Sequence, residues 1–340
     1  MAWGFYYDFS SSVKPIKSGC ALCREAAGVI PLGGGFQIYN TQNRDGSVRL
    51  WEVHELKDIS KFVRDREPFL KGSKPFSNIG VLYSDYDMRN KSDSLFYSGG
   101  NDEVKGAVRL VLDSAYTCSI LMDYMLTPEY LKNKNIIIAP EIKYMSDDIK
   151  NALFKFSEDG GNLIISGSES EKHRNISVPY KSRYINQYAR ASDTDNLIVK
   201  TKHGKGNIIR IHYNIFEIYC NSPDFYVRNM LADIINELNE DSFIEYKGQK
   251  FVDIVTAKKD DKLLINLTNT SGIYSENRLR VYDEIQPMTD MQIIVKCGKE
   301  PLSVMVQPEN IIPDYKYDSQ TQKLTVKIDK LDIHAVIVIE

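Results

Sequence analysis

The sequence predicts an α/β protein built from three successive regions. Strand-like and helix-like segments alternate over residues 1–72, a pattern typical of a parallel sheet with covering helices. The alternation continues with short connections over residues 76–240 and favours an open, doubly wound α/β domain. Residues 243–340 contain short strands and no long helical pattern, which predicts a small antiparallel β-sandwich.

The first region has the order β-α-β-α. "AWGFYY" and "GFQIYN" are the expected strands, and apolar spacing predicts helices over residues 18–31 and 53–70. Two strands alone do not make a stable parallel sheet, because such strands need both faces buried. The region therefore has the pattern expected for the end of a larger domain.

Three consecutive glycines, 33 to 35, raise the question of a phosphate-binding loop. Such a loop follows a strand and precedes a helix, whereas these glycines follow a helix and precede a strand. The sequence also lacks GxGxxG and the GK[ST] signature. We interpret the glycines as a helix stop and expect no cofactor.

The second region carries clear start and stop signals. Ser146 is a candidate N-cap for the helix "SDDIKNALFKFSEDGG", and Gly160 and Gly161 close it. "NIGVLYS", "NIIIAPEI" and "NLIISGS" are expected strands. "NLIVKTKHGKGNIIRIHYN" predicts a hairpin that turns at Gly204–Gly206, before a last helix in "DFYVRNMLADIINEL".

The third region shows six short strands separated by turns: "KFVDIVT", "KLLINLT", "QIIVK", "LSVMV", "KLTVKI" and "IHAVIVI". Leu324, Val326 and Ile328 alternate with polar residues, as in a strand with one buried face. This spacing indicates the sandwich.

Composition limits the class of protein. The net charge is -3 and the basic residues are spread evenly, which argues against nucleic acid. The longest apolar runs are too short to cross a bilayer, and the N-terminus does not resemble a signal peptide. The five cysteines are an odd number and are scattered, so we expect reduced thiols and a cytoplasmic protein. Cys20 and Cys23 lie on a helix without further ligands, so no metal site is expected.

The second region shows no nucleophile motif. Ser166 and Ser168 flank Gly167, but the spacing differs from GxSxG. No catalytic residue is identified in the chain on this basis.

Polar and aromatic residues gather at the ends of the two strands of the first region. If these strands are parallel neighbours, both sets project at one rim. Aromatic faces with amide and guanidinium donors suit a sugar. The candidate substrate-binding residues are Trp3, Phe5, Asp8, Gln37, Tyr39, Asn43, Arg44 and Asp45. The alternative, equally supported by the residues, is that "NRDG" is only a turn.

The order of several stretches resembles a known family. "MAWGF", "CREAA", "GGGFQIYNTQNRDGS" and "FVRDREPFL" look like the end of the catalytic barrel in alpha-L-fucosidase-like bacterial glycoside hydrolases. "NIIIAPEI" and "FSEDGGNLIISGS" look like strands of the class I glutamine amidotransferase-like, or beta-galactosidase trimerisation, domain that follows in that family. "KLLINLTNTSG" and "IHAVIVIE" look like its C-terminal β-sandwich.

The resemblance implies a fold and a function. Residues 1–72 would be the last two βα units of a (β/α)8 barrel, 76–240 a flavodoxin-like α/β domain and 243–340 the sandwich. The chain would be the C-terminal part of a glycoside hydrolase, supplying rim residues of a site for a fucoside or galactoside. Its partners would be an upstream barrel segment or further copies of the chain. The family's catalytic residues lie on earlier strands, so none is assigned here.

Two other hypotheses remain open. The chain could be a stand-alone, non-enzymatic scaffold or sugar-binding protein, because no catalytic set is visible. It could also be a divergent hydrolase that acts through Ser166 and Ser168.

Overall fold

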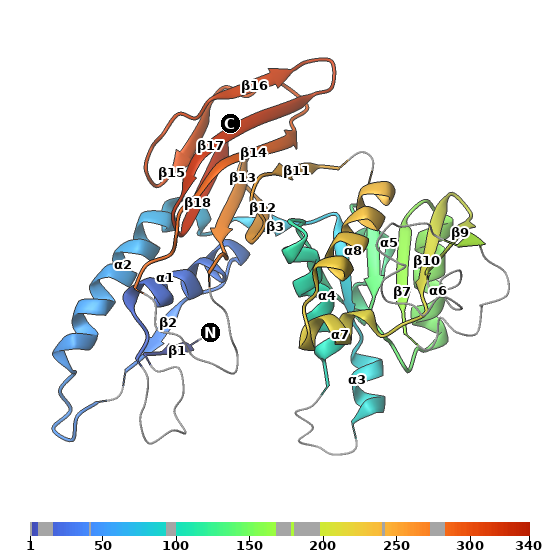
Figure 1. Ribbon diagram of the computed structural model, residues 1–340, viewed down its shortest axis with the longest axis horizontal. Coiled ribbons are helices and arrows are strands. Elements are labelled where there is room, and N and C mark those ends of the chain that lie inside the picture. Colours follow the sequence, from blue (N-terminus) through green and yellow to red (C-terminus); the bar gives the residue numbers. More distant parts are fainter. Residues whose placement is uncertain are drawn as a thin grey trace. The chain divides into compact units, whose positions relative to one another are not determined.

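The structure is a mixed α/β fold with several sheets (Figure 1). It divides into two compact units, one formed by Met1–Phe76 with Phe243–Glu340 and the other by Ser77–Ser242. The computed structural model describes residues 2–5, 16–40, 42–92, 100–167, 178–179, 198–239, 242–272 and 283–340.

The first unit begins with a pair of parallel strands, β1 (Ala2–Gly4) and β2 (Gln37–Tyr39). Between them lie α1 (Gly19–Ala27) and the 3₁₀ turn η1 (Ile30–Leu32), and α2 (Leu50–Leu70) follows. The helix predicted over 18–31 is thus divided in two, because Pro31 has no N–H to continue the α-helical bonds. Gly33 ends η1 with a left-handed φ of 79°, which confirms the predicted stop.

Helices α1 and α2 pack on one face of this strand pair. Leu22 of α1 and Ile59 of α2 are buried together with Phe5, and Ile38 of β2 packs against them. Ser18 caps α1 by accepting a hydrogen bond from Ala21 N at 3.1 Å.

Two antiparallel sheets complete the first unit. One has the order β11 (Ile244–Lys247), β14 (Met288–Lys296), β17 (Lys323–Leu331), β16 (Tyr315–Asp318). The other has the order β15 (Val304–Gln307), β18 (His334–Ile339), β13 (Lys262–Asn269), β12 (Val252–Lys259), β3 (Lys74–Phe76). The six predicted strands of the third region are all present.

The central strands of the five-stranded sheet, β18 and most of β13, are buried on both faces. On one face, Val336 and Val338 of β18 pack with Ile30 of η1 and Leu70 of α2. The residues of β18 that point to the other face are buried as well. Strand β3, which follows α2, pairs with β12 and so connects the end of α2 to this sheet. These contacts explain why residues 1–76 belong to the same unit as the two antiparallel sheets.

The second unit is built on a seven-stranded sheet. Its order is β5 (Ser119–Met122), β4 (Ile79–Tyr83), β6 (Ile136–Ala139), β7 (Asn162–Ser166), β10 (Gly206–Ile211), β9 (Ile198–His203), β8 (Val178–Pro179). The first five strands are parallel, and β9 and β8 pair antiparallel. Every residue of β6 is buried, as expected for a central parallel strand.

Helices cover both faces of this sheet. One face packs against α4 (Asp102–Asp113), α7 (Ile215–Asn221) and α8 (Phe225–Leu238). The other packs against α5 (Pro128–Leu131) and α6 (Asp147–Glu158). Two further short elements, α3 (Asp85–Lys91) and the turn η2 (Asp123–Met125), follow β4 and β5.

Within the described part of the chain, no helix combines the length and the apolar character needed to cross a bilayer.

Candidate functional site

The two strands that carry the predicted sugar-binding residues are parallel neighbours. Ala2 pairs with Gln37, and Gly4 pairs with Tyr39. Because parallel strands end at the same edge, the residues that follow β1 and β2 start from one rim. The adjacency on which the sequence argument depended is confirmed.

The two faces of this pair differ. Ile38 points to the side of α1 and α2 and packs in their apolar cluster. Gln37 and Tyr39 are exposed, and since neighbouring residues in a strand alternate between faces, they lie on the opposite side. We call this side, defined by Gln37 and Tyr39, the open face. Tyr39 is 63% exposed, so its ring is available to a ligand.

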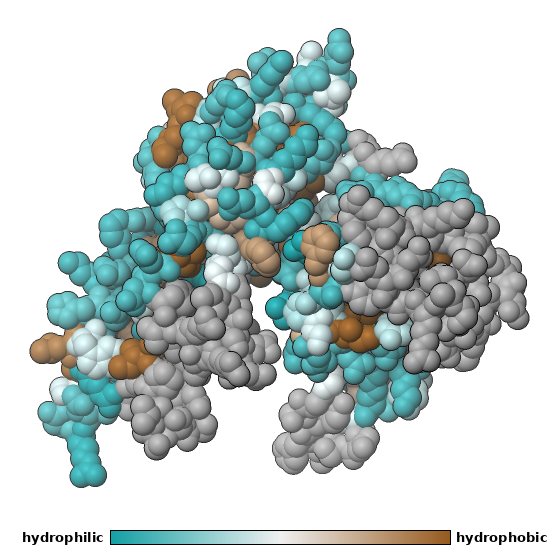
Figure 2. Space-filling model, in the orientation of Figure 1, coloured by the Kyte–Doolittle hydropathy of each residue, from teal (hydrophilic) through white to brown (hydrophobic). Residues whose placement is uncertain are grey.

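Apolar side chains are also exposed beside this rim. Val48, Leu50 and Val53 lie around the beginning of α2, and Leu50 is 80% exposed. Figure 2 shows apolar side chains on the surface at that end of the helix. A cluster of this kind marks a surface that a partner or a further part of the protein can cover.

Phe5 does not contribute to the open face. Its ring is 1% exposed and lies 5.5 Å from the Trp51 ring in an edge-to-face contact. Trp3 lies in β1 opposite Ile38 in the register, and its side chain lies outside the described part of the structure. Asp8 also lies outside the described residues.

The polar loop after β2 is a hydrogen-bonded turn. Gly46 N donates to Asn43 O at 3.0 Å, and Asn43 N donates to Ser47 O at 2.9 Å. Asp45 Oδ1 accepts from both Ser47 N at 3.0 Å and Ser47 Oγ at 2.6 Å, which lowers the pKa of Asp45. The alternative interpretation of "NRDG" as a turn is therefore correct for the backbone, and Arg44 is exposed within it.

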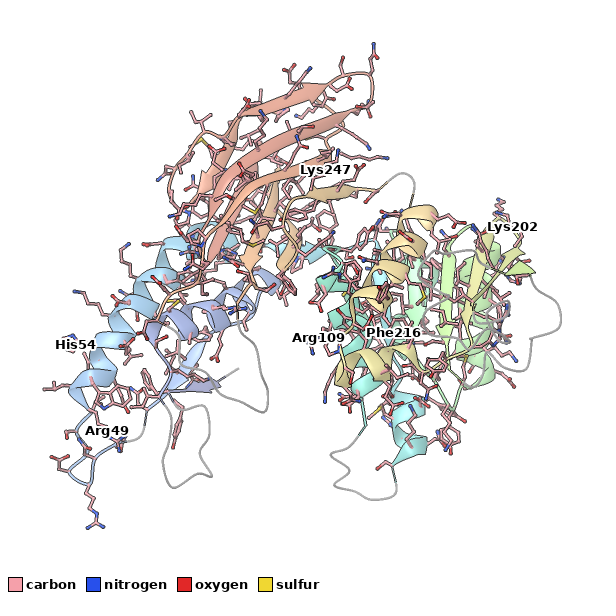
Figure 3. The ribbon with its side chains drawn as sticks, in the orientation of Figure 1. Arg49, His54, Arg109, Lys202, Phe216 and Lys247 are labelled. Carbon is pink, nitrogen blue, oxygen red and sulfur yellow. The ribbon has the colours of Figure 1, made fainter. Side chains whose placement is uncertain are left out.

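A buried carboxylate at the start of α2 was missed by the sequence argument. Glu52 has no exposed surface, and neither carboxylate oxygen accepts a hydrogen bond from the described residues. Its ion-pair partner is Arg49, whose Nη1 lies 3.9 Å from Glu52 Oε1. Figure 3 shows Arg49 and His54 at this end of α2. An acidic residue in a first helical turn is so common that the sequence gives no sign of its burial.

The described part of the carboxyl edge of the second unit holds a buried acid, Glu141. Glu141 follows β6 with a φ of 37°, and its carboxylate accepts from Phe216 N at 3.0 Å and Glu217 N at 3.3 Å. Burial raises the pKa of Glu141 to about 7, against the lowering effect of these hydrogen bonds.

Of the two serines considered as nucleophiles, the structure describes Ser166, which is not exposed at this edge. Ser166 is fully buried, and its Oγ accepts from Glu141 N at 3.1 Å. Ser168 lies outside the described residues. Over the described ranges, no three His, Cys, Asp or Glu side chains are grouped so as to hold a metal ion.

Comparison with known proteins finds similarity in structure only. No protein-family model and no curated protein matches the sequence. The structure matches alpha-L-fucosidase isoenzyme 2 from Paenibacillus thiaminolyticus with a TM-score of 0.83 at 15% identity, over 100% of this chain and 60% of that chain. It also matches the beta-galactosidase from Bacillus circulans sp. alkalophilus with a TM-score of 0.63 at 9% identity, over 100% and 55%.

A third match has the same character. The beta-galactosidase from the Antarctic haloarchaeon Halorubrum lacusprofundi gives a TM-score of 0.54 at 12% identity, over 98% of this chain and 51% of that chain. The chain thus spans about half to three fifths of the length of these solved proteins. It has the fold of a portion of glycoside hydrolases.

Proposed function

We propose that the chain is the C-terminal part of a carbohydrate-active glycoside hydrolase and that β1 and β2 belong to a (β/α)8 barrel. The observation that carries this is the one-sided covering of the β1–β2 pair by α1 and α2. In such a barrel, helices cover the outside while the inner face of each strand meets the other strands. The open face with Gln37 and Tyr39 has the character of that inner face.

The apolar cluster beside the rim supports a missing segment. Val48, Leu50 and Val53 are exposed next to the strand pair, where further βα units of a barrel would bury them. On this proposal a preceding barrel segment covers both the cluster and the open face, and the chain alone is not catalytic.

The second unit supports the same family of architectures. Numbered along the unit, its parallel strands β5, β4, β6, β7 and β10 have the order 2-1-3-4-5, which is the flavodoxin-like order. We assign it as a class I glutamine amidotransferase-like, trimerisation-type domain over residues 76–240 that serves as scaffold. The two antiparallel sheets are then the C-terminal β-sandwich.

The sugar site on this proposal is the rim of β1 and β2. The exposed Tyr39 ring suits the C–H face of a pyranose, and the Gln37 amide and Arg44 guanidinium suit its hydroxyls. Trp3, Asp8, Asn43 and Asp45 remain candidates at the same rim. The fucosidase and galactosidases of similar fold make a fucoside or galactoside the first ligand to test.

Calorimetric titration with L-fucose and D-galactose tests the proposal. A single sugar on an incomplete rim should bind with a Kd of about 1 mM, which corresponds to about -4 kcal/mol. Tyr39→Ala should weaken binding by about three- to tenfold, the value of one aromatic contact. Tyr124→Ala is the matched control, because Tyr124 is 73% exposed and lies in the second unit.

The results separate the hypotheses. The barrel proposal expects an apolar dye to bind the free chain at the exposed cluster, and expects no hydrolysis of aryl fucosides or galactosides. Hydrolysis by the chain alone would overturn it. Sugar binding without dye binding would instead favour a stand-alone sugar-binding protein.

A further inference from the structure

A large pocket lies in the second unit, at the edge of the sheet opposite to the carboxyl edge. Its volume is about 950 Å³, and it is lined at the amino ends of β6, β7 and β10. The end of α6, the end of α8, α5 and strand β9 form its sides. This volume is at the upper end of small-molecule sites and exceeds what one sugar ring needs.

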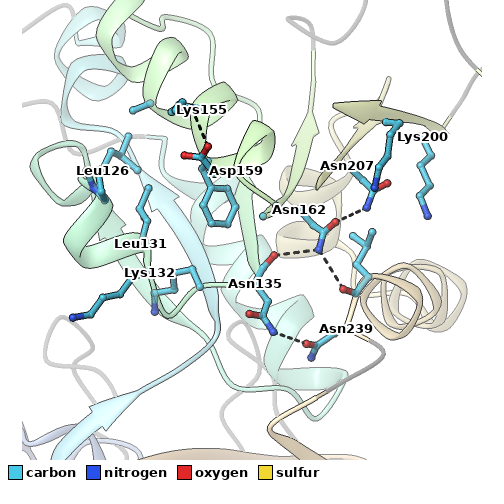
Figure 4. A pocket seen from close by; sticks show the side chains of 18 of the residues that line it. Leu126, Leu131, Lys132, Asn135, Lys155, Asp159, Asn162, Lys200, Asn207 and Asn239 are labelled. Carbon is cyan, nitrogen blue, oxygen red and sulfur yellow. Dashed lines mark hydrogen bonds and ion pairs between the residues drawn. The ribbon is translucent and has the colours of Figure 1, made fainter. Parts of the chain in front are cut away.

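The floor of the pocket is a network of asparagine amides. Asn207 Nδ2 donates to Asn162 Oδ1 at 2.7 Å, and Asn135 Nδ2 donates to Asn239 Oδ1 at 3.2 Å. Asn162 Nδ2 donates to the backbone oxygens of Asn135 at 3.3 Å and Leu238 at 3.2 Å. Figure 4 shows these side chains converging on one region of the pocket. The network fixes the amides in place before any ligand arrives.

The network leaves both hydrogen-bond acceptors and a hydrogen-bond donor unused. Within the described part of the chain, Asn135 Oδ1 and Asn207 Oδ1 accept no hydrogen bond, and Asn239 Nδ2 donates none. A hydroxyl group can donate a hydrogen bond to these oxygens and accept one from the free amide N–H, so hydroxyls suit this floor. Buried apolar side chains of Leu131 and Phe156 line the same pocket, which suits the C–H faces of a sugar.

The sides of the pocket are positively charged. The lining residues include five lysines but only two acids, Asp159 and Glu237. These acids pair with Lys155 at 2.8 Å and with Lys200. The lysines of the lining are Lys132, Lys134, Lys155, Lys200 and Lys202.

Three of these lysines, Lys132, Lys134 and Lys202, have no carboxylate partner among the described residues. Lys134 Nζ instead donates to Ser77 O and Ser119 Oγ. Lys132 follows α5 at one side of the amide floor, whereas Lys200 and Lys202 lie on β9. Lys202 Nζ donates to the backbone oxygen of Lys205 at 3.0 Å, which leaves its charge uncompensated. Figure 4 shows Lys132 and Lys200 on opposite sides of the asparagines. The pocket thus has a neutral amide floor between two positive ends.

We infer that this pocket binds an acidic oligosaccharide, with hydroxyls on the asparagine floor and negative groups toward Lys132 and Lys202. The inference concerns the second unit and does not depend on the sugar site proposed for β1 and β2.

Titration of the whole chain with trigalacturonate tests the inference. Neutral galactotriose, a sulfated trisaccharide and inorganic sulfate are the comparison probes. Trigalacturonate should bind at least about tenfold more tightly than the neutral sugar, and more weakly at high salt, because exposed charge pairs are screened. The sulfated trisaccharide distinguishes a general acidic-sugar site from one that takes carboxylates.

Charge reversals locate the site. Lys132→Glu and Lys202→Glu should each weaken trigalacturonate binding by about fivefold, roughly 1 kcal/mol. Asn207→Ala should weaken binding of neutral and acidic sugars alike, with its folding checked by thermal denaturation. Lys150→Glu is the matched control, because Lys150 is exposed on α6 outside the pocket lining. Tyr39→Ala should leave this binding unchanged, which separates it from the rim site.

Three results would overturn the inference. Equal affinity for galactotriose and trigalacturonate would show that the lysines do not recognise the negative groups. Complete competition by inorganic sulfate would reduce the site to an anion site without sugar recognition. Binding unaltered by both lysine reversals would place the ligand elsewhere.

Discussion

Replacement of Arg66 by methionine should destabilise the first unit by removing a buried link between α2 and β18. Arg66 is 6% exposed. Its Nε donates to His334 Nδ1 at 3.0 Å, its Nη2 to His334 O at 2.8 Å and its Nη1 to Phe62 O at 3.0 Å. Its Cζ also lies 3.6 Å from the centre of the Phe62 ring. Methionine fills similar volume but makes none of these bonds.

The size of the effect follows from two opposing contributions. Three hydrogen bonds from a charged donor contribute about 1.5–3 kcal/mol each. Against them, burial lowers the pKa of Arg66 to about 10, and each unit of that change costs about 1.4 kcal/mol. The difference leaves a net loss of about 3 kcal/mol on substitution, in the range for breaking a buried charged contact.

Urea denaturation followed by tryptophan fluorescence measures this loss. Both tryptophans, Trp3 and Trp51, belong to the first unit, so their emission reports its unfolding. With an m-value of about 2 kcal/mol/M, the midpoint should fall by about 1–2 M. Arg64→Met is the matched control, since Arg64 is exposed on the same helix. A midpoint for Arg66→Met equal to that of the control would refute the reasoning.

The same contact makes a pH prediction. Burial, and secondarily the charge of Arg66, lower the pKa of His334 well below its ordinary value of 6.5. The folded chain therefore binds fewer protons at His334 than the unfolded chain in acid. Stability of the first unit should hold above about pH 6.5 and fall below it by up to about 1.4 kcal/mol per pH unit. A tryptophan-detected stability that rises between about pH 6 and about pH 5 would contradict this.

Three further substitutions test other parts of the structure. Burial raises the pKa of Glu141 to about 7, so its contribution to stability is lost as pH rises through that value. Glu141→Gln should therefore stabilise the second unit by about 2 kcal/mol near pH 8 and much less near pH 5, as measured by thermal denaturation. Gly106→Ala should lower the free energy of unfolding of the second unit by about 1–3 kcal/mol, although alanine has the better helix propensity, because the new Cβ would lie 1.8 Å from a backbone oxygen of α7. Gly28→Ala is the control and should be tolerated, because its Cβ meets no such contact. Ser47→Ala should raise the pKa of Asp45 in an NMR titration, because Ser47 provides the hydrogen bonds that lower it; an unchanged pKa would contradict the turn geometry.

Local signals in the sequence predicted many elements correctly. Ser146 caps α6, Gly33 ends η1, and Leu324, Val326 and Ile328 are buried on one face of β17. These features depend on residues within a few positions of one another. Capping, left-handed backbone and strand alternation are decided by that local chemistry.

Elements that depend on distant partners were missed. β3 is three residues long and contains a proline, and it exists as a strand because Phe76 O accepts from Thr256 Oγ1 and its backbone pairs with β12. Helix α7 is short, and its first backbone N–H groups are held by Glu141, far away in the sequence. No local periodicity in the sequence predicts either β3 or α7.

The candidate site divides in the same way. The sequence by itself determined that aromatic and polar residues follow two strand-like segments, because strand patterns are local. The structure showed that these two strands are parallel neighbours. Only the tertiary structure decided that Phe5 is buried against Trp51 while Tyr39 is exposed. The asparagine floor and the Arg66–His334 contact were likewise decided there, since residues far apart in the chain form both. Which side of a strand is covered depends on what packs against it, and packing joins residues that the sequence separates.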